Sequence, residues 1–305
     1  MPKVSVIINC HNGEKYLSAC LESIQRQTFT DYEVIFWDNC SNDRSAEIAQ
    51  SFTGVKYYRG TEFVTLGKAR NCALEKANGD YVSYIDCDDF WEPDKLKLQV
   101  AELDNNDRCG LVLTNYRRLN MLNNTSKDVY TNRLKKIVSF SDLVMNYHFC
   151  LSSFMFRKKA LVGLDHYFNE LFNYAEEFEL FSRIAYKWDT IYLPEVLVTY
   201  RIHGTMNTMK LQDRKAAEYA MILESLRTMY EDIDKNEPKA MKWIEFNRDW
   251  NAAKTDFRNG KKLEARVLMK PYIQFNKRAL IFVVLSYFPN KVFTFLNRLY
   301  YANRY

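Results

Sequence analysis

Residues 79–93 read GDYVSYIDCDDFWEP, and they decide the class of fold. Tyr81–Ile85 is a short apolar run of the kind found in strands that are buried on both faces of a sheet. The run leads directly into DCDD at residues 86–89, so three carboxylates lie where the strand ends. Asn78-Gly79 before it signals a helix end and a turn, and it closes a helix predicted over residues 67–77. Helix, turn, buried strand and acidic edge follow one another here, as in α/β proteins.

The same alternation of strand and helix runs back to the start of the chain. Apolar runs predict strands over Val4–Ile8, Tyr32–Trp37 and Val55–Tyr58, with apolar residues at helical spacing between them. Strands separated by helices imply a mostly parallel sheet that is covered on both faces. Further along, the pattern predicts strands over residues 111–114, 153–156 and 191–200, and a helix over residues 174–188.

Only helices are predicted from about residue 211 onward. We therefore expect an α/β domain over residues 1–207 and a helical region over residues 208–305, whose end is basic and apolar.

Composition excludes several classes of protein. Of 305 residues, 47% are hydrophobic, which is too many for a disordered chain, and 9 Gly with 6 Pro exclude a collagen-like one. No apolar run reaches the roughly 18 residues of a spanning helix, and the start lacks a signal-peptide pattern. The 7 Cys have no zinc-knuckle spacing, which favours free, buried thiols in a reducing cytoplasm.

The basic charge lies at one end of the chain. Residues 265–305 carry seven Lys or Arg and no acid, so a net charge of +5 leaves −2 for the first 264 residues. This argues against a nucleic-acid groove in the α/β domain. Apolar and aromatic residues alternate with the cations over residues 277–305. Such a tail suits the peripheral surface of an anionic membrane, and a packed helical cap or a homodimer interface stays open as the alternative.

Three polar sets follow predicted strands at the edge where ligands bind in such sheets. They are Asn9 with His11, Asp38 with Asn39, and the acidic residues Asp86, Asp88 and Asp89. Neither GxGxxG nor a P-loop occurs, so the common dinucleotide and phosphate fingerprints are absent. Crowded carboxylates are usually tolerated because they hold a divalent cation. Capping of the following helix is the structural alternative for Asp88 and Asp89.

Ordered motifs along residues 3–204 resemble glycosyltransferase family 2, the inverting sugar transferases of the GT-A fold. The matching stretches are residues 4–8 with His11-Asn12, 31–35, 38–43, 69–71, 78–81, 86–89, 152–157, 176–177, 193–195 and 200–203. The resemblance implies a Rossmann-like sheet with helices on both faces. It also implies a nucleotide-sugar donor and a glycan or lipid-linked glycan acceptor, as in the assembly of bacterial surface polysaccharides.

The resemblance also implies roles for single residues. Asn9, His11, Asp38 and Asn39 would lie against the nucleoside, and Arg70 against the base or the diphosphate. Many relatives carry Asp where this chain has Asn39, and there the carboxylate accepts from uracil N3–H. Because an Asn oxygen can accept the same bond, a UDP-sugar stays favoured.

The acidic residues match the family's DxD motif. Asp86 would contact the ribose, and Asp88, Asp89 and His203 would hold Mg²⁺ or Mn²⁺ against the diphosphate. Glu176-Glu177 matches the acidic pair at a helix start that supplies the general base, with Glu177 at the base position.

Two other functions remain open from the sequence. A nucleotidyltransferase would need a basic loop after the first strand, and residues 9–14 supply none. A catalytically inactive sugar-nucleotide-binding protein would have lost its acidic pairs, and this chain still has acidic residues at those positions.

Overall fold

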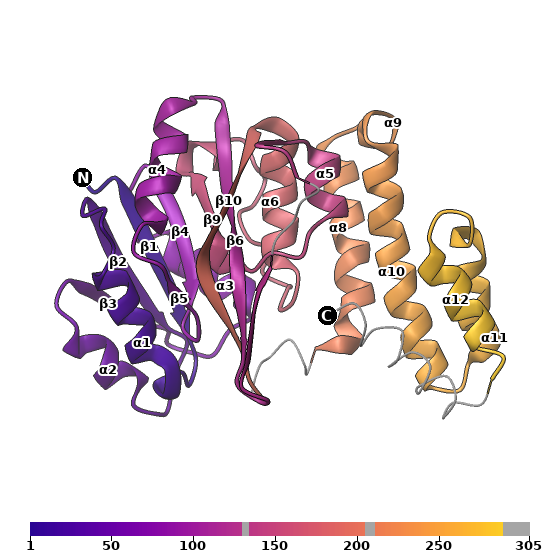
Figure 1. The fold of residues 1–305 in the computed structure, drawn as a ribbon, viewed down its shortest axis with the longest axis horizontal. Coiled ribbons are helices and arrows are strands. Elements are labelled where there is room, and N and C mark those ends of the chain that lie inside the picture. Colours follow the sequence, from indigo (N-terminus) through magenta and orange to yellow (C-terminus); the bar gives the residue numbers. More distant parts are fainter. Residues whose placement is uncertain (130–133, 205–210, 289–305) are drawn as a thin grey trace. The chain divides into compact units, whose positions relative to one another are not determined.

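The computed structural model describes residues 1–129, 134–204 and 211–288. The chain divides into two compact units, Met1–Asn207 and Thr208–Tyr305, and each is treated by itself below. The first unit is built on one sheet with strand order β3-β2-β1-β4-β9-β6-β10-β5, flanked by helices (Figure 1). This is the mostly parallel α/β architecture that the sequence predicts.

Four parallel strands form one half of the sheet, and their last residues carry the polar sets of the sequence. They are β1 (Val4–Cys10), β2 (Tyr32–Asp38), β3 (Val55–Arg59) and β4 (Tyr81–Asp86). Asn9 lies in register with Asp86, and Cys10 with Asp38. Because the strands run the same way, their polar ends meet at one edge of the sheet.

The other half of the sheet mixes strand directions. β9 (Phe154–Arg157) runs antiparallel to both β4 and β6 (Cys109–Asn120), while β10 (Asp189–Ile202) pairs in parallel with β6. The register of β10 shifts between Leu193 and Val196, on either side of Pro194, as expected for a residue without an N–H. Three strands that the sequence analysis did not predict complete the sheet: β5 (Phe90–Trp91), β7 (Thr125–Val129) and β8 (Ile137–Val138).

The helices of the first unit alternate with the strands. They are α1 (Glu14–Gln25), α2 (Ser45–Ser51), α3 (Leu66–Leu74), α4 (Lys95–Asn105), α5 (Phe140–Met145) and α6 (Glu176–Lys187). Short 3₁₀ turns occur at Leu151–Ser153 (η1) and Lys158–Leu161 (η2). The two helices that matter most for the site are α3 and α6, since they carry Arg70 and the Glu176-Glu177 pair.

The second unit is helical in its described residues. It comprises η3 (Gln212–Arg214), α8 (Lys215–Met229), α9 (Ile233–Asn236), α10 (Pro238–Arg258), α11 (Lys262–Met269), η4 (Lys270–Tyr272) and α12 (Lys277–Leu285). One face of α12 packs into a core with α10 and α11 through Ala279, Phe282 and Val283. Its Leu280 and Val284 stay about half exposed.

The basic, apolar end of the chain is described only in part. Residues 289–305, which hold the second apolar segment and three of the seven cations, lie outside the described residues. No helix in the part of the chain that the structure describes has the length and apolar character needed to cross a bilayer.

Candidate active site

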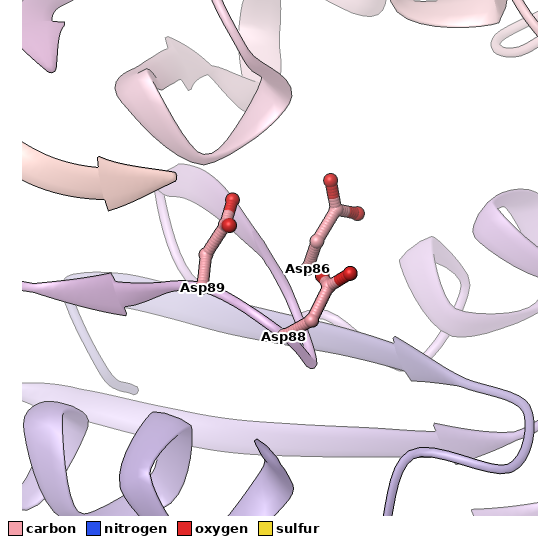
Figure 2. A group of neighbouring side chains, drawn as sticks. All are labelled: Asp86, Asp88 and Asp89. Atoms are coloured by element: carbon pink, nitrogen blue, oxygen red, sulfur yellow. The ribbon is translucent and has the colours of Figure 1, made fainter. Parts of the chain in front are cut away.

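The acidic turn after β4 brings three carboxylates together (Figure 2). Asp86 ends the strand, and Asp88 and Asp89 follow in the turn before β5. One carboxylate oxygen from each of the three lies within 4.8 Å of the others. The turn is therefore compact enough for its oxygens to share one cation.

The hydroxyl of Ser152 holds this turn in shape. It donates to Asp89 Oδ2 over 2.6 Å and accepts from the backbone N–H of Asp86 over 3.1 Å. The other oxygen of Asp89 accepts from the backbone N–H of Arg201 over 3.1 Å, and Asp89 is completely buried. Since both its oxygens already accept hydrogen bonds, Asp89 positions the turn, and Asp86 and Asp88 offer the more open oxygens.

His203 approaches Asp88 from the end of β10. Its Nε2 donates to Asp88 Oδ2 over 2.8 Å, and its ring lies 4.6 Å from the ring of Tyr16. The contact joins residues 115 positions apart in the chain. The expected meeting of this histidine with the acidic motif thus occurs in the fold.

The charges of the turn fit a divalent cation. Burial and the charge of Asp88 raise the pKa of Asp86 to about 6, although the positive charge of Arg70 opposes the rise. Burial, with the charges of Asp88 and Asp86, also raises the pKa of Asp89 well above its usual range. A cation would remove this repulsion, and a set of carboxylate oxygens with one imidazole suits Mg²⁺ or Mn²⁺.

Arg70 links the acidic turn to the start of α6. Its guanidinium forms an ion pair with Glu176 and lies 3.6 Å from Glu177 and 3.4 Å from Asp86. Burial alone lowers the pKa of Arg70, but the three carboxylates raise it above its ordinary value. Arg70 is only 3% exposed. Its positive charge is therefore paired with three carboxylates in this structure. A contact of Arg70 with a diphosphate stays a prediction.

The two glutamates at the start of α6 differ in environment. Glu176 is buried against Arg70, whereas the side chain of Glu177 keeps 18% of its surface exposed. Burial raises the pKa of Glu177 well above its usual range, and the negative charge of Glu176 raises it further, while Arg70 acts in the opposite direction. A raised pKa makes the ionised carboxylate a stronger base than that of an ordinary Glu, and Glu177 keeps some contact with solvent, so it is the better suited of the two to general-base work.

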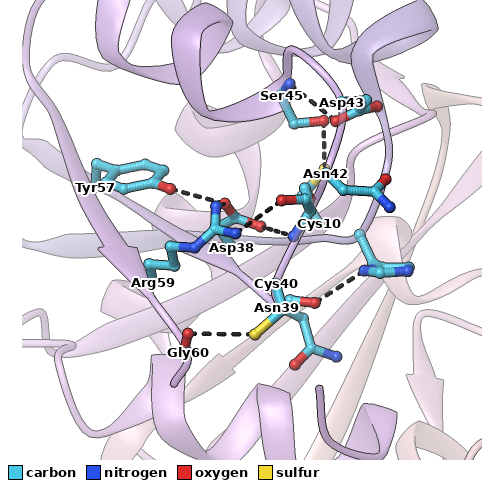
Figure 3. A network of polar contacts seen from close by, with 12 residues as sticks. Cys10, Asp38, Asn39, Cys40, Asn42, Asp43, Ser45, Tyr57, Arg59 and Gly60 are labelled. Atoms are coloured by element: carbon cyan, nitrogen blue, oxygen red, sulfur yellow. Dashed lines mark hydrogen bonds and ion pairs between the residues drawn. The ribbon is translucent and has the colours of Figure 1, made fainter. Parts of the chain in front are cut away.

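Asp38 accepts hydrogen bonds that fix the loop following β2 (Figure 3). Its Oδ1 accepts from the backbone N–H of Ser41 over 2.6 Å, and its Oδ2 accepts from Tyr57 Oη and Arg59 Nη1, each over 2.7 Å. Asp38 is completely buried. These bonds hold the polar loop of residues 39–43 against β3, and direct contact of Asp38 with a nucleoside stays a prediction.

Asn39 and His11 lie beside this loop. The Asn39 amide donates to the carbonyl of Val64 over 2.9 Å and accepts from its N–H over 3.2 Å. His11 Nδ1 donates to the carbonyl of Asn39 over 2.9 Å, and its exposed ring lies 4.6 Å from that of Phe63. The sequence analysis missed Phe63, although a bulky aromatic residue in a polar loop was a usable signal. Phe63 is 63% exposed, so the two rings offer an aromatic surface at the edge of the sheet.

Asn9 and Tyr147 each bury a polar atom that has no hydrogen-bond partner among the described residues. Asn9 donates to the carbonyl of Ala69 over 2.8 Å, but its Oδ1 is buried and has no hydrogen-bond donor among the described residues. The hydroxyl of Tyr147 is likewise buried without a partner in the described part of the chain, and its ring lies 4.6 Å from Phe178, next to Glu177. No local pattern marks Tyr147, which follows α5 and reaches the start of α6 only through the fold.

Comparison with known proteins agrees with this geometry. Residues 5–164 match the model of the family described as glycosyl transferase family 2. The chain belongs to this family. Chondroitin synthase from Escherichia coli is 26% identical over 232 residues, which cover 74% of this chain and 33% of that protein. The chain spans between a third and two thirds of the length of the first curated relatives that it matches.

Solved structures of two other proteins share the fold of this chain. TarS residues 1–349 from Staphylococcus aureus, in complex with UDP-GlcNAc, superpose with a TM-score of 0.66 at 20% identity, covering 93% of this chain and 84% of that one. The mannosyltransferase PcManGT from Pyrobaculum calidifontis, in complex with GDP-Man and Mn²⁺, gives 0.62 at 16% identity, covering 100% and 81%. The GT-A fold predicted from the motifs is thereby confirmed.

Proposed function

We propose that the protein transfers a sugar from a nucleotide-diphosphate sugar to a hydroxyl of a glycan or lipid-linked glycan, with inversion at the anomeric carbon. The observation that carries the proposal is the position of Arg70. It contacts Asp86 of the acidic turn on one side and Glu176 and Glu177 on the other. A donor diphosphate at the turn and an acceptor hydroxyl at Glu177 would therefore lie side by side.

Each group of residues has its own task in this proposal. Asp86, Asp88 and His203 would hold Mg²⁺ or Mn²⁺, and the cation when bound neutralises charge on the departing diphosphate. Glu177 takes the proton of the acceptor hydroxyl as its oxygen bonds to the anomeric carbon and the bond from that carbon to the diphosphate breaks. Glu176 and Arg70 hold Glu177 in place.

The donor in this proposal is a UDP-sugar. The unpartnered Oδ1 of Asn9 and the aromatic surface of His11 and Phe63 support a nucleoside at the edge of the sheet. The UDP-GlcNAc complex of the TarS neighbour supports uridine, whereas the PcManGT neighbour was solved with a guanosine donor. Uracil recognition by Asn39 requires its amide to exchange the present bonds to Val64.

A panel of donors tests this function. We expect hydrolysis of one among UDP-, GDP- and dTDP-sugars to depend on Mn²⁺ or Mg²⁺ and to stop with EDTA. Asp88→Asn should lower the rate at least about 10²-fold, because a charged metal ligand is lost. A near-normal rate of Asp88→Asn in EDTA would contradict the metal role, and no turnover with any donor would contradict the transferase.

The proposal includes a place of action at the inner face of the cell membrane. Six exposed apolar side chains on and after α11 and α12 support it: Leu263, Val267, Leu280, Val284, Tyr287 and Phe288. Lys262 donates to the carbonyl of Phe288, and the guanidinium of Arg266 lies 4.3 Å from the ring of Tyr287, so cations lie beside the last two of these residues. Apolar surface with bordering cations suits an anionic bilayer.

A further inference from the structure

Two cysteines lie next to each other at the acidic turn. Cys10 is the last residue of β1, and Cys87 directly follows Asp86, the last residue of β4. The two strands are parallel neighbours, with Asn9 in register with Asp86, so the residue after each of these is again a neighbour of the other. Adjacent strands are about 4.8 Å apart, which lies within the range of Cα separations that a disulfide can bridge.

Both thiols face the same small space at Gly13. A Cβ added at Gly13 would lie 2.7 Å from Cys10 Sγ and 2.9 Å from Cys87 Sγ. The two sulfur atoms are therefore no farther apart than these two distances taken together. Because glycine has no side chain, nothing from residue 13 separates them. Cys10 Sγ also donates to Ser45 Oγ over 3.6 Å, which fixes the direction of its thiol (Figure 3).

The fold holds the two cysteines differently. Cys10 is 2% exposed and lies in register with Asp38 of β2, and its carbonyl accepts from the backbone N–H of Asn39 over 2.8 Å. Cys87 is half-buried and lies in the turn that follows β4. A bond between the two sulfur atoms would therefore form mainly by movement of Cys87 toward β1.

We propose that Cys10 and Cys87 are a redox-active thiol pair, which hydrogen peroxide converts reversibly into a disulfide. The thiolate of one cysteine attacks the peroxide, so that an S–O bond forms, the O–O bond breaks and hydroxide leaves. The thiolate of the other then attacks this sulfur, so that the S–S bond forms, the S–O bond breaks and a second hydroxide leaves. The two thiol protons convert both hydroxides to water, and two thiols are oxidised for each peroxide reduced.

The disulfide would disturb the acidic turn. Cys87 lies between Asp86 and Asp88, and these residues with Asp89 bring one carboxylate oxygen each to within 4.8 Å of the others while the cysteines are free thiols. An S–S bond is only about 2.05 Å long, so Cys87 would draw both neighbours with it. Cation affinity depends on the geometry of its ligands, and the oxidised protein should hold Mn²⁺ more weakly. This consequence rests on the proposed function, but the thiol pair itself does not.

Thiol counting and peptide mapping of the full chain test the pair without donor or metal. After reduction, a stoichiometric amount of hydrogen peroxide should remove two of the seven thiols, and a peptide that links Cys10 to Cys87 should appear. Dithiothreitol should restore both thiols, because it reduces a disulfide but not a sulfinic acid. No loss of thiols, a bridge between other cysteines, or a loss that dithiothreitol does not reverse would overturn the proposal.

Calorimetric titration with Mn²⁺ tests the effect on the turn. The oxidised parent should bind Mn²⁺ about tenfold more weakly than the reduced parent, as for other changes next to metal ligands. Cys10→Ala should match the reduced parent before and after peroxide, because it cannot form the bridge. Cys72→Ala is the matched control and should respond to peroxide as the parent does, since Cys72 is also half-buried but lies on α3.

The two measurements separate this proposal from the proposed function. If the reduced protein binds no Mn²⁺, the metal role in the proposed function fails, and the mapped bridge still decides the thiol pair. A mapped bridge with equal Mn²⁺ affinity in the oxidised and reduced forms would overturn the effect on the turn. An equal fall in Mn²⁺ affinity for the parent and Cys10→Ala on treatment with peroxide would overturn the assignment to this pair.

Discussion

At the scale of single residues, the start of α6 shows how neighbours in sequence take different tasks. Glu176 turns inward to the guanidinium of Arg70, and Glu177 keeps contact with solvent. The adjacent position on a helix points about 100° away, so one side chain can be buried while the next faces the site. Glu177 is therefore the more accessible of the two carboxylates.

Replacing each glutamate by its neutral isostere tests this division. We expect Glu177→Gln to lower transfer at least about 10²-fold while donor binding changes only a few-fold, because the base touches the acceptor and not the nucleotide. Steady-state transfer and nucleotide titration measure the two effects. Loss of transfer in Glu176→Gln but not in Glu177→Gln would assign the general base to Glu176. Full activity in both variants would show that neither glutamate is the base.

The pH profile gives a prediction with a definite sign. Because burial and Glu176 raise the pKa of Glu177, the base stays protonated and inactive to a higher pH than an ordinary Glu of about 4.3. Activity should therefore rise with pH along an acid limb above that value. Two negative charges, those of Glu176 and Asp86, raise the pKa of Glu177. Glu176→Gln removes the first of them, so the acid limb should move to lower pH. An unchanged limb in this variant would argue that another group titrates.

At the scale of elements, α3 and the loop before α6 are packed so closely that only glycine fits between them. A Cβ at Gly67 would lie 2.1 Å from the carbonyl oxygen of Asn169. The Thr65 hydroxyl donates to the carbonyl of Glu170, and the Asn71 amide to that of Phe168, so the loop is bonded along the start of α3. This packing brings Arg70 of α3 to the acidic start of α6.

Gly67→Ala should therefore disturb the site as well as the fold. We expect a loss of about 1–3 kcal/mol in the free energy of unfolding, as for other overpacked positions, because backbone atoms of the loop must move. Transfer should fall with it, since Glu176 and Glu177 shift relative to Arg70. Gly163→Ala is the comparison, because its added Cβ meets no atom within 4 Å but its φ of +83° is strained. It should lose stability while keeping the activity of its folded fraction.

At the scale of the whole molecule, the two units have separate cores and different surfaces. The structure shows one packed and one exposed face on α12, since Phe282 is 3% exposed and Val284 is 51% exposed on the same helix. Whether the exposed face contacts a membrane stays a prediction. Removing α12 would open the core of the second unit. Substitutions on its exposed face are therefore the sharper test of membrane binding.

We expect the intact protein to float with vesicles rich in anionic lipid and to dissociate as salt rises toward about 0.5 M, because screening weakens surface charge. The double variant Leu280→Asp/Val284→Asp should float much less, whereas Val162→Asp, at an exposed apolar position of the first unit, should float normally. Equal, negligible flotation of the parent with neutral and anionic vesicles would reject the membrane proposal.

The sequence by itself determined the parallel half of the sheet and the polar ends of its strands. Runs such as Val4–Ile8 and Tyr81–Ile85 are confirmed within one or two residues, because burial on both faces leaves a local apolar signature. The short strands β5, β7 and β8 left no such signature: β5 and β8 have two residues each, and most of β7 is polar and exposed.

Only the tertiary structure decided which polar groups are free to act. Asp38 and Asp89 carry the same carboxylate as Asp88, yet the fold surrounds both with hydrogen-bond donors and leaves Asp88 facing His203. Tyr147 and Ser152 reach the site from distant segments, so local spacing gives no indication of what they contact. The sequence gives the chemistry of each side chain. The partners of that side chain depend on contacts between residues far apart in the chain, and such contacts form only when the chain folds.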